Sequence, residues 1–189
     1  MKRSQINEMC AEAKGVFEKC GWTLPPEPRW DFTDFGKNDI ANAALVLVNL
    51  AEEKEYCEKL MYARPWQWTP CHAHKLKQED IICRSGKFLI RVWDSARLED
   101  GVKIVLKING RPTGLVSGTD IFIPAGSRIT LTPGIYHEFT PVEKDTVIGE
   151  VSTANDDSND NFFVDPDIGR FPGVEEDVPS EYLLVSDVK

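Results

Sequence analysis

The positions of the three histidines constrain this chain more than any other feature of its sequence. His72 and His74 stand two residues apart, and His137 follows much later in Gly-Ile-Tyr-His. On an extended strand, residues two apart point to the same face, so the imidazoles of His72 and His74 converge. Glu79 can return to the same point after a short turn. Three nitrogens and one carboxylate oxygen form a ligand set for a metal ion.

A chance His-x-His pair on a strand surface is the alternative interpretation, because single motif matches are frequent by accident. The addition of Glu79 and His137 favours the metal site. Cys71 adjoins His72 and so points to the opposite strand face, which makes it a poor ligand candidate. The other four cysteines are Cys10, Cys20, Cys57 and Cys83. This odd set without paired C-x-x-C spacing indicates neither a disulfide framework nor a zinc ribbon.

Length and charge narrow the possible classes of protein. A chain of 189 residues with a 41% hydrophobic fraction suits one domain with a substantial core. The net charge of −9, without a basic stripe, argues against binding to nucleic acid or to an anionic membrane. The N-terminus lacks the apolar region of a signal peptide and no apolar run reaches the length of a membrane span, so we expect a soluble, cytoplasmic protein.

The order of local signals predicts an all-β domain with one N-terminal helix. Ser4 can cap an amphipathic helix that runs to about Cys20, and a proline-rich extended connector follows. Short strands with turns between them occupy most of the remaining chain, and Asn109-Gly110 is a strong hairpin signal. This pattern is typical of a sandwich or barrel and not of repeated β-α-β units.

We therefore divide the single domain, residues 1–189, into three parts. Residues 1–34 form the helix and connector, residues 35–153 form the β-barrel, and residues 154–189 form a C-terminal extension. We expect this polar, irregular extension to close one end of the barrel over the site, with a disordered terminus as the alternative.

Two further residues are candidates for the chemistry of the site. Lys77 stands two before Glu79, so an extended segment would direct its ammonium group to the metal side; a solvated lysine on a turn is the alternative. Glu150 is a lone carboxylate in an apolar strand. Burial would raise the pKa of Glu150 and suit it to moving protons, whereas an exposed edge position would leave it without that role.

The spacing of His72, His74 and Glu79, followed by Gly86, resembles the first motif of the cupin superfamily. A second cupin motif is present as Pro133-Gly134-Ile135-Tyr136-His137. The resemblance implies a double-stranded β-helix, which is a jelly-roll barrel.

Three longer segments are similar to the D-lyxose isomerase family of cupin sugar isomerases, and the similarity extends from about Phe35 onwards. These segments are Pro70 to Ile81, Thr132 to Phe139 and Gly149 to Asp157, and parts of the tail from Asp160 to Leu184 also agree. Members of that family interconvert D-lyxose with D-xylulose and D-mannose with D-fructose, and use a divalent metal ion.

The resemblance implies a role for each candidate residue. The metal ligands would be His72, His74, Glu79 and His137, holding manganese, with cobalt, zinc, iron and nickel as other metals that suit these donors. Lys77 would bind the sugar oxygens and Glu150 would be the acid and base. Asp160 and Arg170 would contact further sugar hydroxyls or close the tail over the site. The family also implies a homodimer.

Three other functions remain open at this stage. Acireductone dioxygenases use the same ligand spacing for oxidation, but would leave Lys77 and Glu150 without a role. A phosphosugar isomerase would need a local cluster of basic groups, and only Lys75, Lys77 and Arg84 are available near the motif. A sugar-binding cupin without activity would keep the ligands and would not require Glu150.

Overall fold

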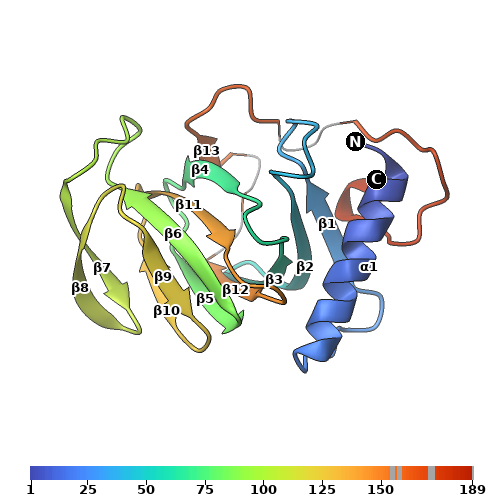
Figure 1. Ribbon diagram of the computed structural model, residues 1–189, viewed down its shortest axis with the longest axis horizontal. Coiled ribbons are helices and arrows are strands. Elements are labelled where there is room, and N and C mark those ends of the chain that lie inside the picture. Colours follow the sequence, from blue (N-terminus) through green and yellow to red (C-terminus); the bar gives the residue numbers. More distant parts are fainter. Residues whose placement is uncertain (154–155, 157–158, 170–172, 189) are drawn as a thin grey trace.

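Two antiparallel β-sheets packed face to face form the body of the molecule (Figure 1). The computed structural model describes residues 1–153, 156, 159–169 and 173–188. The larger sheet has eight strands in the order β1-β2-β3-β12-β5-β10-β7-β8, and the smaller has five in the order β13-β4-β11-β6-β9. The elements are α1 (Arg3–Lys19), β1 (Arg29–Thr33), β2 (Leu45–Glu52), β3 (Tyr56–Tyr62), β4 (Thr69–Ala73), β5 (Glu79–Ser85), β6 (Lys87–Trp93), β7 (Lys103–Ile108), β8 (Arg111–Val116), β9 (Ile121–Pro124), β10 (Arg128–Leu131), β11 (Tyr136–Pro141), β12 (Val147–Thr153), β13 (Phe162–Phe163) and the 3₁₀ helix η1 (Val185–Asp187).

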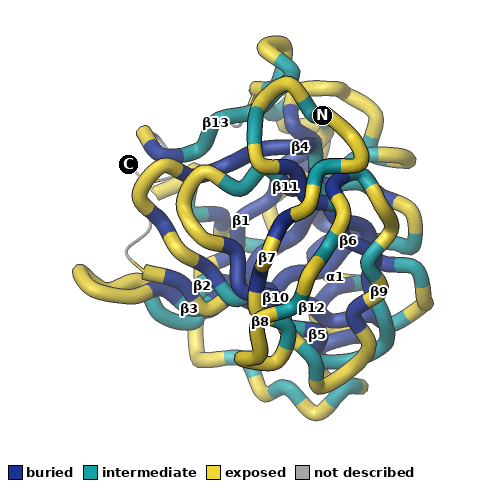
Figure 2. The backbone as a smooth tube through the Cα atoms, turned by 90° about the vertical axis from the view of Figure 1, so that its left-hand side faces the viewer, coloured by how far each residue is buried: buried dark blue, intermediate teal, exposed yellow. Residues whose placement is uncertain are grey.

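The main core lies between the two sheets. Ile81 and Ile148 face it from the larger sheet, and Ile90 and Phe139 face it from the smaller, all at most 2% exposed. Figure 2 shows the strands that carry these residues, β5, β6, β11 and β12, as mostly buried or half-buried, whereas much of β8 is exposed. The predicted all-β jelly-roll fold of the cupin class, with a short N-terminal helix, is confirmed.

Helix α1 covers the outer face of the larger sheet at the end formed by β1, β2 and β3 (Figure 1). Its apolar residues at near-helical spacing, including Ile6, Met9, Ala13 and Phe17, are buried in a second core. The helix begins at Arg3, one residue before the predicted cap. Ser4 is therefore inside the first turn, and its hydroxyl donates to Asp177 at 2.7 Å.

The connector contains a strand that sequence analysis did not predict. Residues 29–33 form β1, which pairs antiparallel with β2 from Arg29 opposite Asn49 to Thr33 opposite Leu45. Trp30 and Phe32 point into the core beneath α1, which anchors this edge strand. The preceding prolines concealed the strand because they favour any extended conformation.

The predicted hairpin at Asn109-Gly110 is confirmed. Both residues have positive φ, 52° and 78°, as a two-residue turn between β7 and β8 requires.

The described part of the C-terminal extension contacts both the smaller sheet and α1. Strand β13 pairs with β4, with Phe163 opposite His72, in the smaller sheet. Further along, Glu175 bridges to Lys2, and Arg3 binds both Glu176 and Asp187 beside α1. Within the described ranges, no helix has the length and apolar character needed to cross a membrane.

Candidate active site

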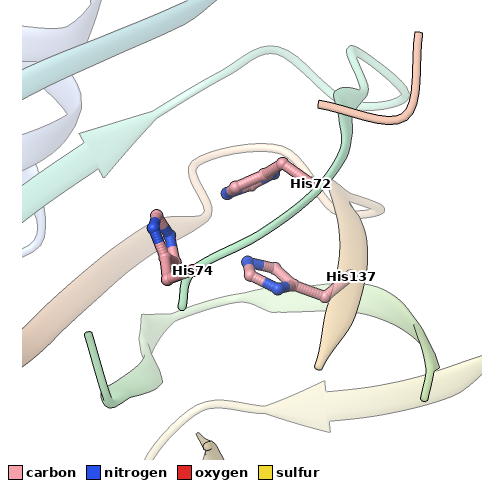
Figure 3. A group of neighbouring side chains, drawn as sticks. All are labelled: His72, His74 and His137. Atoms are coloured by element: carbon pink, nitrogen blue, oxygen red, sulfur yellow. The ribbon is translucent and has the colours of Figure 1, made fainter. Parts of the chain in front are cut away.

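The three histidines meet on the inner face of the smaller sheet (Figure 3). His72 lies on β4, His74 follows the end of that strand, and His137 lies on β11 directly opposite His72 in the ladder. The two-residue periodicity of β4 and the antiparallel pairing with β11 account for this convergence. One ring nitrogen from each histidine lies within 4.8 Å of the others.

Backbone carbonyls orient all three imidazoles. The Nδ1 atoms of His72, His74 and His137 face the carbonyl oxygens of Pro70, Asp160 and Ile135 respectively. A carbonyl can only accept a hydrogen bond, so each Nδ1 carries a proton, and in the neutral ring Nε2 then keeps its lone pair. This tautomer presents Nε2 as the metal-binding atom, with the orienting partner that metal-binding histidines usually have.

Glu79, at the start of β5, adds a carboxylate to the group. Its Oε1 lies 3.1 Å from Nε2 of His137 and 3.6 Å from Nε2 of His74. In the part of the chain that the structure describes, these three buried atoms have no hydrogen-bond partner. Lone pairs that face one another in a buried site repel unless a cation lies between them. The donor set therefore fits a divalent metal ion.

The electrostatics of the cluster keep the ligands in their metal-binding forms. Burial and the neighbouring imidazoles hold the pKa of His72 well below its ordinary value, and burial lowers the pKa of His74. Burial raises the pKa of Glu79, but Lys77 and the adjacent histidines outweigh it and hold that pKa well below the usual range. Neutral imidazoles and an ionised carboxylate are the states that bind metal.

Lys77 connects the histidine cluster with Glu150. Its side chain is buried, and its Nζ lies 3.0 Å from Oε2 of Glu79 and 3.0 Å from Oε1 of Glu150. Burial disfavours the ammonium ion, yet the two carboxylates outweigh burial and raise the pKa of Lys77. The structure thus places a positive charge next to the candidate metal ligands and not on an exposed turn.

Glu150 lies in the middle of β12, where its Cα is paired with Lys59 on β3 and Ile81 on β5. It is 5% exposed and accepts a hydrogen bond from Ser152 Oγ at 3.0 Å. The expectation that its pKa is raised was wrong. Burial does raise the pKa, but Lys59 and Lys77 outweigh burial and the net shift is downward. Glu150 is therefore held as a carboxylate, which is the form that accepts a proton.

Asp160 is close to the site but its carboxylate does not line the pocket. Its oxygens accept hydrogen bonds from the backbone N–H groups of Lys75, Leu76 and Lys77 at 2.7 to 3.1 Å. These hydrogen bonds direct the carboxylate of Asp160 at the backbone of the loop between β4 and β5. Arg170, the other predicted sugar contact, lies outside the described residues.

Five polar residues that line the pocket were not selected from the sequence. They are Asp31, Thr33, Lys59, Thr69 and Asn161. Lys59 is 4% exposed because β3 is covered by the main core on one face and by α1 on the other, so the strand has no polar face to distinguish it. The Oδ1 of Asn161 is buried with no hydrogen-bond partner in the described ranges.

The lining of the pocket combines two kinds of group. It contains the candidate metal donors, Lys77 and Glu150, and also the hydrocarbon groups of Leu45, Leu47 and Met61. Such a site can bind a small polyhydroxy compound and transfer a proton while water is largely excluded.

Known proteins with related sequences share one description. Residues 27–188 match the model of the D-lyxose isomerase family. The D-lyxose/D-mannose isomerase of Serratia proteamaculans is 40% identical over 97% of this chain and 96% of its own length. That of Escherichia coli O157:H7 is 31% identical over 100% of this chain and 99% of its own length.

Solved structures with the same fold are more distant in sequence. A mutant of the L-ribose isomerase of Acinetobacter sp. DL28, in complex with L-ribose, aligns with a TM-score of 0.69 at 17% identity, over 93% of this chain and 98% of that chain. The L-ribose isomerase of Geodermatophilus obscurus gives a TM-score of 0.66 at 17% identity, over 88% of this chain and 93% of that chain. At this identity the likeness concerns the fold alone. The family match and the curated relatives confirm the resemblance found in the sequence, and the chain therefore belongs to the D-lyxose isomerase family.

Proposed function

We propose that this sugar isomerase interconverts D-lyxose with D-xylulose, and D-mannose with D-fructose, with a divalent metal ion bound by His72, His74, Glu79 and His137. The observation that carries the proposal is the buried Lys77–Glu150 pair, 3.0 Å apart, directly beside those metal donors. Aldose–ketose isomerisation needs a proton acceptor and a stabiliser of oxygen charge in the same enclosed site. The names of the related enzymes support the choice of substrates.

In the proposed reaction, Glu150 removes the proton from C2 of the open-chain aldose and returns it to C1. The proton of the C2 hydroxyl moves to O1, so the intermediate is an enediolate, and return of the proton from Glu150 to C1 gives the ketose. Lys77 donates hydrogen bonds to the sugar oxygens as negative charge develops on them. Lys59 and Ser152, which contact Oε1 of Glu150, keep its carboxylate in one orientation. A bound divalent ion would supply Lewis acidity and a template for two neighbouring sugar oxygens.

The C-terminal extension has a part in this proposal. Asn161 and Phe163 line the pocket, and the ring of Phe163 lies 5.4 Å from that of His72, centroid to centroid. We propose that this segment closes the barrel over the bound sugar and excludes water. The buried, unpartnered Oδ1 of Asn161 is positioned to accept a hydrogen bond from a sugar hydroxyl.

Manganese is the metal that we propose, because imidazole and carboxylate donors suit a divalent first-row ion and the family resemblance favours manganese. We also propose a homodimer, which is the commonest closed assembly of soluble enzymes and can be measured by light scattering.

The test uses chelator-stripped protein incubated with D-lyxose or D-mannose, with and without added Mn²⁺, and measures ketose formation. We expect manganese-dependent D-xylulose and D-fructose. Glu150→Gln should lower turnover by about 10²-fold or more while Mn²⁺ still binds. His74→Ala should lose both Mn²⁺ binding and turnover.

Three outcomes would contradict the proposal. Metal binding without ketose from any aldose tested would favour an oxidative cupin, which oxygen consumption would then reveal. Unchanged turnover in Glu150→Gln would remove the proposed acid and base, and sugar binding without turnover would favour the sugar-binding alternative.

A further inference from the structure

The C-terminal segment around Asp160 makes more contacts with the metal-binding loop than a loose cover would need. The loop from His74 to Gln78 connects β4 to β5, so it joins two of the proposed ligands, His74 and Glu79, and contains Lys77. A single residue of the tail, Asp160, contacts this loop through both its backbone and its side chain.

The backbone of Asp160 fixes one metal ligand. Its carbonyl oxygen accepts a hydrogen bond from Nδ1 of His74 in a buried position. On the other side, the N–H of Gly134 donates to the carbonyl of His74 at 2.7 Å. The ring and the main chain of His74 are therefore each held by a separate segment.

The side chain of Asp160 fixes the rest of the loop. One carboxylate oxygen accepts from Lys75 N at 2.7 Å and the other from Lys77 N at 2.8 Å, while Leu76 N is 3.1 Å from both. Three consecutive N–H groups that converge on a carboxylate form a compact anion-binding turn. Its geometry determines where the Lys77 side chain begins.

The neighbouring tail residues hold Asp160 in register with β4. Phe162 and Phe163 pair with Ala73 and His72, and Val164 N donates to the carbonyl of Cys71 at 3.0 Å. The Lys75 ammonium lies 3.9 Å from the centroid of the Phe162 ring. The tail thus contacts every residue from Cys71 to Lys77, both in β4 and in the loop that follows it.

We propose that Asp160 is a positioning residue that holds His74 and Lys77 in their active geometry, so that docking of the C-terminal segment and assembly of the metal centre are coupled. This inference rests on the proposed metal-dependent function. It replaces a direct sugar contact for Asp160. Because coupling is reciprocal, metal binding should also tighten the attachment of the tail.

The test compares Asp160→Asn with Asp165→Asn. The first change keeps the shape of the side chain but places an NH₂ group against the backbone N–H donors of the loop. The second removes a tail carboxylate that pairs with Lys37 at 2.6 Å and does not contact the ligand loop, so it is a matched control. The Kd for Mn²⁺ is measured by calorimetry on chelator-stripped protein, and kcat and KM for D-lyxose are measured at saturating Mn²⁺.

We expect Asp160→Asn to weaken Mn²⁺ binding by about 10- to 100-fold, because the loop that joins His74 to Glu79 loses the carboxylate that holds its N–H groups, and outer contacts of this kind orient metal ligands. At saturating Mn²⁺, kcat should fall more than KM changes, and Asp165→Asn should match the unmodified protein. An unchanged Kd with a raised KM would overturn the inference in favour of a sugar contact. Failure of the unmodified protein to bind Mn²⁺ would instead overturn the metal centre itself.

A measurement on the unmodified protein keeps the test decisive if Asp160→Asn does not fold. Hydrogen–deuterium exchange is followed with and without Mn²⁺. We expect Mn²⁺ to slow exchange in residues 74–78 and in residues 160–164 together. Slower exchange in the loop with no change in the tail would contradict the coupling.

Discussion

Lys59 and Glu150 are direct partners on the antiparallel strands β3 and β12, and their side-chain charges lie 3.9 Å apart with 4% and 6% of each side chain exposed. Sequence separation conceals this relationship, because 91 positions divide the two residues. A buried ammonium group at this distance favours the ionised form of the carboxylate.

Lys59→Met should make the isomerase more sensitive to acid. Burial raises the pKa of Glu150, and the positive charges of Lys59 and Lys77 lower it. Removal of Lys59 therefore leaves a higher pKa. Glu150 must be ionised to accept a proton, so the acidic limb of kcat/KM should move to higher pH. The pH profile at saturating Mn²⁺ measures this, with Lys59→Arg as the control that keeps the charge. If the acidic limb of Lys59→Met lies at the same pH as that of the unmodified protein, Lys59 does not control the ionisation of Glu150.

Removal of the metal should destabilise the fold. A ligand at 100 times its Kd stabilises the folded state by about 2.7 kcal/mol, which corresponds to a Tm difference of roughly 5–10 °C for a chain of this size. We expect a chelator to lower Tm by this amount and excess Mn²⁺ to restore it. His74→Ala should show no response to Mn²⁺. A response equal to that of the unmodified protein would place the ion elsewhere.

Arg3→Gln should remove the ion pairs that hold the end of the tail against α1, and the resulting loss of thermal stability should depend on pH. Arg3 is 3% exposed and binds Glu176 and Asp187. Arg3 lowers the pKa of Glu176, and it outweighs the effect of burial to lower the pKa of Asp187.

Carboxyl groups with a lowered folded-state pKa stabilise the fold above their unfolded pKa, and this stability is lost as pH falls through the folded pKa. The Tm difference between the unmodified protein and Arg3→Gln should therefore be several degrees near neutrality and shrink below about pH 4. Thermal melts across pH measure it. A difference independent of pH would indicate lost packing alone.

Phe17→Ala should test the second core. Phe17 is fully buried between α1 and the larger sheet. Its ring stacks on that of Trp30, with 6.5 Å between the ring centroids. Truncation of a buried phenylalanine costs about 3–5 kcal/mol of unfolding free energy. Urea unfolding measures the loss. The control is Phe122→Ala, because Phe122 is 54% exposed, and there we expect a change within about 0.5 kcal/mol. Equal losses in the two variants would contradict this account.

The sequence was most informative where a short-range pattern determines the structure. The spacing of His72 and His74 predicts that their imidazoles converge, and Asn109-Gly110 predicts a tight turn, and both are found. The pairing of β4 with β11 brings His137 to the other two histidines, and only the tertiary fold determines that pairing.

The sequence was least informative where burial on two faces removes the alternation of polar and apolar residues. Lys59 lies in such a strand, so its sequence context gives no indication that it faces Glu150. The contacts of Asp160 were also not predictable, because a carboxylate that binds backbone N–H groups leaves no pattern in the residues it contacts. The downward shift in the pKa of Glu150 follows from the same hidden neighbours.

The position of β12 between β3 and β5 has a consequence for the order of folding. The larger sheet stays in two separate halves until this late strand is inserted, because no other strand of that sheet connects β3 to β5. Such long-range pairing is slow, and the nascent chain would expose two unpaired strand edges during synthesis. The strand that completes the sheet also carries Glu150. A kinetic intermediate that lacks β12 would therefore also lack the carboxylate that we propose as the acid and base.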